Sequence, residues 1–155
     1  MAAALLASAV FAARPNESLH FVTSLSGAEE VPPNSSLASG VAIFHLSADG
    51  MSLSYKLIAS NIENVTQAHI HAPAPAGANA GVVAWLYPEE GQAPILIPGR
   101  HDGVLATGTI TADDLVGSLA GQPLSALIAQ IQSGNAYVNV HTTQFPGGEI
   151  RGQLD

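Results

Sequence analysis

The stretches QAHIHA at residues 67–72 and YVNVHT at residues 137–142 decide how this chain is interpreted. Both are apolar segments that carry histidine, and both have the length of a β-strand. Because residues two apart in a strand point to the same face, His69 and His71 would present two imidazoles side by side. His141 would add a third if the two strands lie next to each other in a packed sheet. The pattern predicts a site where imidazoles from two strands converge.

Three converging imidazoles are typical of a metal site. Imidazole nitrogen suits copper and zinc, and copper(II) heads the affinity order for nitrogen ligands. Three histidines with an open fourth position suit a catalytic metal, whereas a closed site needs one more ligand. His101 is the candidate fourth ligand, although its spacing does not place it near the others. The alternative interpretation is that His69, His71 and His141 form structural hydrogen bonds on a polar sheet face.

The composition limits the classes of protein that this chain can belong to. A length of 155 residues suits one domain, and 47% apolar with 10% charged residues argues against disorder. The formal charge of −8 makes nucleic acid and anionic membranes poor partners, because both need clustered Lys and Arg. The absence of cysteine excludes disulfides, thiolate zinc sites and cysteine nucleophiles.

The first residues indicate export. Residues 1–13 are small and apolar and end before Arg14, which is typical of a signal peptide, although the usual basic start is missing. An ordinary N-terminal helix is the alternative. Glycosylation sequons begin at Asn16, Asn34 and Asn64. No other apolar run approaches the ~18 residues that a membrane span needs. We expect a secreted or extracellular protein, periplasmic or cell-surface in a bacterium, with no span in the mature chain.

The rest of the chain has the pattern of short antiparallel strands. Fifteen Gly and ten Pro indicate many turns. An Asp-Gly pair at residues 49–50 between apolar runs predicts a hairpin, and Leu53, Tyr55 and Leu57 alternate with polar residues as in a half-buried strand. About eight or nine such strands predict an all-β, antiparallel β-sandwich. The expected strands are 19–24, 40–46, 53–59, 65–72, 82–87, 94–97, 103–110, 136–142 and 149–154.

One short helix is predicted before the penultimate strand. The sequence TADD at residues 111–114 has the features of a helix N-terminus, with acidic residues where the helix dipole favours them. Leu124, Leu127, Ile128 and Ile131 then recur at the spacing of one apolar helix face.

Four segments in order resemble the CHRD domain, the module first described in chordin. They are LSGAEEVPP at 25–33, AHIH at 68–71, GNAYVNVHT at 134–142 and PGGEIRGQL at 146–154. The resemblance covers about residues 21–154 and implies a single domain over 19–155. It also implies an immunoglobulin-like Greek-key β-sandwich that acts outside the cell.

A second resemblance, confined to the site, is to copper/zinc superoxide dismutase. It implies that His69, His71 and His141 match three copper-ligand histidines of that enzyme. Its bridging histidine and zinc ligands lie in the loop after the His-X-His strand, and residues 73–81 of this chain contain neither His nor Asp. Its disulfide cysteines are also absent, and Arg151 does not match its active-site arginine.

Two functions from different classes follow. The first is a secreted, non-enzymatic CHRD module that binds an extracellular protein or matrix partner and carries copper or zinc. The alternative is a mononuclear copper oxidoreductase of superoxide-dismutase type. Hydrolase and kinase motifs are absent. His20 and His45 are expected to be ordinary strand residues, and Trp85 and Tyr137 core residues. Glu149 and Arg151 are expected to form a surface ion pair; the alternative is that they hydrogen-bond the histidine strand from behind the site. Glu29 and Glu30 are expected to lie in an exposed acidic loop; the alternative is that they bind a partner or a cation.

Overall fold

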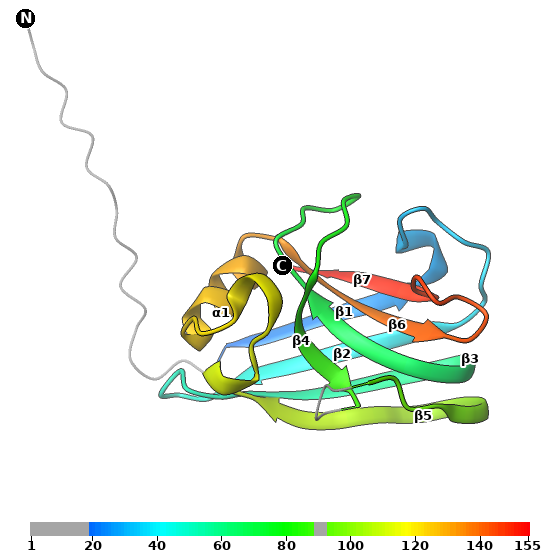
Figure 1. The fold of residues 1–155 in the computed structure, drawn as a ribbon, viewed down its shortest axis with the longest axis horizontal. Coiled ribbons are helices and arrows are strands. Elements are labelled where there is room, and N and C mark those ends of the chain that lie inside the picture. Colours follow the sequence, from blue (N-terminus) through cyan, green and yellow to red (C-terminus); the bar gives the residue numbers. More distant parts are fainter. Residues whose placement is uncertain (1–18, 89–92) are drawn as a thin grey trace, which may run out of the picture.

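Seven antiparallel strands and one α-helix form the part of the chain that the computed structural model describes, residues 19–88 and 93–155 (Figure 1). The predicted signal peptide, residues 1–13, and the sequon at Asn16 lie outside these residues. Three single-turn 3₁₀ helices cover Gly27–Glu29, Ala112–Asp114 and Gly117–Leu119. The main elements are β1 (His20–Ser26), β2 (Ser39–Leu46), β3 (Leu53–His71), β4 (Val82–Tyr87), β5 (Ile97–Ile110), α1 (Leu124–Gln132), β6 (Ala136–Thr142) and β7 (Ile150–Leu154).

The strands pair in the order β2-β1-β7-β6-β3-β4, and β2 also pairs with β3. Strands β1, β2, β3, β6 and β7 therefore form a closed ring, in which β1 joins β7 where Ser26 lies opposite Arg151. Figure 1 shows α1 near one end of these strands. The ring encloses an apolar core because alternate residues of each strand point inward. Its fully buried members include Phe44, Leu57, Ile70 and Val138.

Strand β3 organises this arrangement because its two parts pair with different neighbours. Its first part pairs with β2 and β5, and its last part with β6 and β4. Between the parts, Asn61 and Asn64 adopt positive φ values of 55° and 53°. The β3–β5 pairing changes register at the same place. Asn tolerates this left-handed conformation better than other non-glycine residues, so the strand bends without ending.

Two pairs of predicted strands are continuous in the structure, which accounts for the difference between the predicted and observed strand numbers. The segments expected at 53–59 and 65–72 are joined in β3, and β5 runs from Ile97 through the segment expected at 103–110. The described residues thus contain seven strands where about eight or nine were predicted. The all-β, antiparallel class with one helix is confirmed, and the arrangement is consistent with a β-sandwich.

The hairpin and the helix were predicted with different success. Leu46 pairs with Leu53 across the Asp-Gly turn, as expected. The apolar face of α1 is buried at Leu124, Leu127, Ile128 and Ile131, which confirms the helix. The capping sequence was assigned to the wrong element. The Asp114 carboxylate accepts hydrogen bonds from the Thr111 backbone N–H and hydroxyl, and caps the 3₁₀ turn at 112–114 instead.

Among the described residues, no helix is long and apolar enough to cross a membrane. Every residue of β6 is buried. One face of β6 packs into the core, and the loops around it must therefore cover the other face. That second face carries the polar residues of the candidate site.

Candidate metal centre

The pairing of β3 with β6 brings the predicted histidines onto one face. Gln67 lies opposite His141, His69 opposite Asn139, and His71 opposite Tyr137. Because these positions alternate with core residues along both strands, their side chains share the face that points away from the core.

The three histidines form one buried cluster. One ring nitrogen from each of His69, His71 and His141 lies within 4.8 Å of the others. The closest pair is His69 Nδ1 and His141 Nε2, at 3.2 Å. The exposed fractions of the three residues are 3%, 7% and 7% respectively. The structure thus brings together the three residues that the sequence pattern singled out.

Backbone carbonyls determine which nitrogens of two rings carry protons. Nδ1 of His71 lies 2.9 Å from the carbonyl oxygen of Ala80, and Nδ1 of His141 lies 2.9 Å from that of Pro146. A carbonyl oxygen only accepts, so each Nδ1 carries the N–H. In a neutral imidazole the other nitrogen, Nε2, then holds a lone pair. A hydrogen bond of this kind from the far ring nitrogen is usual for histidines that bind metals.

The environment keeps all three rings neutral. Burial, followed by repulsion from His141 and His71, lowers the pKa of His69 to about 3. Burial also lowers the pKa of His71 and His141, although the hydrogen bonds from their Nδ1 atoms to the carbonyls of Ala80 and Pro146 act in the opposite direction. Nε2 of His69 is buried without a hydrogen-bond partner. Neutral imidazole is the form that binds metal ions.

The loop between β3 and β4 covers the cluster. Besides the carbonyl of Ala80, it supplies the carbonyl oxygen of Ala78, which accepts from Nη2 of Arg151 at 2.6 Å. The side-chain oxygen of Asn79 accepts from Nη1 of Arg151 at 2.9 Å, and its nitrogen donates to the Val31 carbonyl. These bonds connect β7, the cover loop and the loop after β1.

Two aromatic rings complete the walls of the centre. Trp85 is half-buried and meets the His69 ring edge-on, with centroids 4.3 Å apart. It therefore belongs to the candidate site rather than to the core. Tyr137 is buried, and its ring stacks on His71 with centroids 4.7 Å apart. The Arg151 guanidinium carbon lies 3.4 Å from the centre of the Tyr137 ring, a favourable cation–π contact.

The predicted surface ion pair between Glu149 and Arg151 is wrong. Arg151 is 2% exposed and contacts the cover loop, while Glu149 is 6% exposed. The Glu149 carboxylate accepts hydrogen bonds from the hydroxyls of Ser36 and Thr142, at 2.6 and 2.7 Å. Their spacing in the sequence suggests an exposed strand face. In the structure the loop after β1 contacts Glu149, and the loop between β3 and β4 contacts Arg151.

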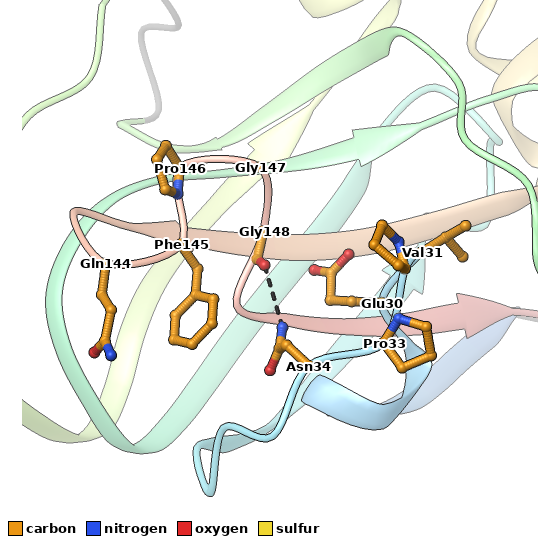
Figure 2. Close-up of a pocket in the computed structure, with 10 residues that line it drawn as sticks. Glu30, Val31, Pro33, Asn34, Gln144, Phe145, Pro146, Gly147 and Gly148 are labelled. Carbon is orange, nitrogen blue, oxygen red and sulfur yellow. Dashed lines mark hydrogen bonds between the residues drawn. The ribbon is translucent and has the colours of Figure 1, made fainter.

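The acidic loop after β1 is exposed at Glu29 but not at Glu30. Glu30 is 6% exposed, and its Oε1 has no hydrogen-bond partner. Burial raises its pKa to about 7, against the effects of Arg151 and the Val31 backbone. Figure 2 shows the Glu30 carboxylate turned toward Gly148, beside a pocket of about 310 Å³. The pocket is lined by residues 30–34 and 144–148.

The remaining candidate residues lie apart from the cluster. His101 lies on β5 opposite Ile62 and is not a member of the three-histidine group. Histidines 20 and 45 face each other across β1 and β2, with ring centroids 4.2 Å apart. The sequon residues are engaged in hydrogen bonds. Asn34 donates to the carbonyls of residues 148 and 149, and Asn64 accepts from the backbone N–H of residue 99.

The CHRD family model matches residues 21–154. The chain therefore belongs to the CHRD domain family, which confirms the resemblance seen in the sequence. No curated protein and no solved structure gives a significant match.

Proposed function

We propose that this protein is an extracellular CHRD module that binds a copper or zinc ion through His69, His71 and His141. The observation that carries the proposal is the proton placement. With Nδ1 of His71 and of His141 each donating to a backbone carbonyl, both Nε2 lone pairs face the centre of the cluster. A cation is the natural partner for converging lone pairs on neutral rings.

The spacing of the donor atoms fits one ion. Zinc or copper binds imidazole nitrogen at about 2.0–2.1 Å, so neighbouring donors on one ion lie roughly 2.9–3.5 Å apart and opposite donors at most about 4.2 Å. The separation of 3.2 Å between His69 Nδ1 and His141 Nε2 is within the first range. The three nitrogens lie within 4.8 Å, so the rings move together slightly when an ion binds.

We further propose that the module is a binding protein rather than an enzyme. The pocket beside Glu30, with its proline and phenylalanine walls, is a site at which a protein or matrix partner can be held. The proposal includes three features expected from the sequence. They are a leader at residues 1–13, a single domain over residues 19–155 and an immunoglobulin-like Greek-key connectivity. Export is tested by N-terminal sequencing of the secreted protein, and connectivity by an experimental structure.

Elemental analysis of the purified protein tests the metal proposal. We expect about one copper or zinc ion per chain in the wild type and in a His101→Ala control, and loss of the ion in His69→Ala. A wild type without stoichiometric metal, or a His69→Ala variant that retains it, rejects the proposal.

The same samples are assayed for superoxide disproportionation. Activity above that of free metal would favour the oxidoreductase alternative.

A further inference from the structure

We propose that the side-chain oxygen of Asn139 is the fourth donor atom of the three-histidine metal centre. The inference rests on the proposed function and adds to it a ligand that is neither a histidine nor a carboxylate. Asn139 lies on β6 opposite His69 and is 3% exposed. Its Oδ1 lies 2.9 Å from Nε2 of His71 and 2.9 Å from Nε2 of His141.

These two contacts do not work as ordinary hydrogen bonds. A neutral imidazole has one N–H, and in His71 and His141 that proton lies on Nδ1, where it faces a backbone carbonyl. The two Nε2 atoms therefore approach Asn139 Oδ1 with lone pairs, and Oδ1 is itself an acceptor. Asn139 Oδ1 thus lies 2.9 Å from each of two nitrogen lone pairs. Lone pairs this close repel one another unless a cation lies among them.

The distances agree with shared coordination. Donor atoms bound side by side on one zinc or copper ion are roughly 2.9–3.5 Å apart, and Asn139 Oδ1 has this separation from two of the three histidines. The distance between His69 Nδ1 and His141 Nε2, 3.2 Å, also lies in this range. Nitrogen from three imidazoles and one amide oxygen make a set of four donors, the usual number for zinc.

The surroundings of the amide favour this orientation. A side chain at Gly148 would meet the Glu30 carboxylate oxygen and the Asn139 amide nitrogen, which shows that both atoms border the same small space. An amide N–H beside a carboxylate is favourable, whereas a rotated amide would place oxygen beside oxygen. Glu30 Oε1 forms no hydrogen bond with the amide, so this preference is electrostatic and depends on the proximity of the two groups.

A fourth protein donor changes what the centre can do. A site whose four positions are filled by protein atoms holds its ion without an open place for a substrate, as structural zinc sites do. This supports a binding role over a catalytic one. It also replaces His101, the fourth ligand expected from the sequence, with a residue on the same strand as His141.

The test measures the affinity for zinc and copper by competition with a chromophoric chelator, in wild type, Asn139→Ala, Asn139→Asp and Asn135→Ala. Asn135 is the matched control because its side chain donates to Ser133, on the turn before β6, and takes no part in the histidine cluster. We expect Asn139→Ala to weaken binding roughly 10- to 100-fold and Asn139→Asp, which adds an anionic oxygen, to strengthen it. The Asn135→Ala variant should match the wild type.

Electron paramagnetic resonance of the copper(II) form gives a second reading that does not depend on affinity. We expect the copper signal of Asn139→Ala to differ from that of the wild type, and water relaxation by the ion to increase as a water takes the fourth position. If Asn139→Ala fails to fold without metal, Asn139→Asp, which has nearly the same shape, provides both readings.

The outcomes separate this inference from the proposed function. Wild-type affinity and an unchanged copper signal in the Asn139 variants would reject the fourth donor while leaving the three-histidine site intact. Weaker binding in Asn139→Asp would show that the amide donates through its nitrogen instead, and would also reject the inference. A wild type that binds no metal would reject both.

Discussion

His71 and His141 are candidate ligands because each carries its proton on Nδ1. This position of the proton leaves the lone pair on Nε2 free to bind a metal ion. A buried imidazole with both nitrogens satisfied by protein groups would be a structural residue, which was the alternative interpretation of this pattern. Here the carbonyls of Ala80 and Pro146 each occupy one nitrogen and leave the other facing the cluster. The loops that supply these carbonyls thus determine the chemistry of the strands.

Trp85 should report directly on metal binding. It is the single tryptophan of the chain, and its ring centroid lies 4.3 Å from that of His69. We expect copper(II), a paramagnetic ion, to quench most of its fluorescence at one equivalent, and zinc to change the intensity much less. A fluorescence titration measures this. Full quenching that persists in His69→Ala would place the copper elsewhere.

Glu30 should make the folded state less stable as pH rises. Its folded pKa is raised from 4.5 to about 7, so between these values the folded protein binds more protons than the unfolded protein. Its contribution to stability is fully present below pH 4.5 and is lost as pH rises through 7. We expect the free energy of unfolding of the wild type to fall, relative to Glu30→Gln, by at most about 3 kcal/mol between pH 5 and 8.

Urea unfolding of the two proteins in the presence of a chelator measures this difference. Taking the difference removes the contribution of His69, whose lowered pKa acts oppositely by destabilising the fold as pH falls from 6.5 toward 3. A gap between wild type and Glu30→Gln that is constant with pH would contradict the raised pKa.

Among the elements, β3 connects the core to the metal centre. Its first part holds β2 and β5, and its last part carries two of the three histidines between β4 and β6. The bend at Asn61 and Asn64 lets one continuous strand serve both sets of neighbours.

The bend predicts a difference between two substitutions of Asn61. This exposed residue has a φ of 55°, and its side-chain oxygen accepts from Arg100. Both Asn61→Gly and Asn61→Val lose that hydrogen bond, but only the β-branched valine is strained at positive φ. We expect the valine variant to be about 1–2 kcal/mol less stable than the glycine variant. Equal unfolding free energies of the two variants would show that the backbone there relaxes.

For the whole molecule, the site lies between a closed ring of strands and the loops that cover it. The side chains on this face are buried only in the folded chain. The three histidines likewise come together only in the folded chain. Metal binding and folding should therefore be linked.

A metal ion should raise the melting temperature. Binding to the folded state alone stabilises it by about 2.7 kcal/mol at a free concentration 100 times the Kd, or roughly 10 °C for a domain of this size. Because burial lowers the pKa of these rings, that of His69 to about 3, the effect should persist at pH 5 and be lost only in stronger acid, where the imidazoles are protonated. Calorimetry at pH 7.5, pH 5 and pH 3, with and without zinc, measures both the stabilisation and its loss. The stabilisation should also be absent in His69→Ala, and a wild-type melting curve indifferent to zinc at pH 7.5 would contradict the linkage.

Local pattern alone predicted the hairpin at Asp49, the apolar face of α1 and the strand with His69 and His71. These features depend on turn chemistry and on the period of apolar residues, which are properties of neighbours in the chain. Burial of Glu30, Arg151 and Glu149 was not predictable in this way, because loops distant in sequence cover them.

The sequence by itself therefore determined the antiparallel all-β class, the family, and the pair of histidines, His69 and His71, that shares a face. The tertiary structure decided that His141 meets this pair and which of the ring nitrogens point inward. It also brought Asn139, rather than His101, into contact with them. The physical reason is that alternation along a strand fixes only the side to which a residue points. The register between β3 and β6, and the backbone carbonyls of the covering loops, determine what it meets there.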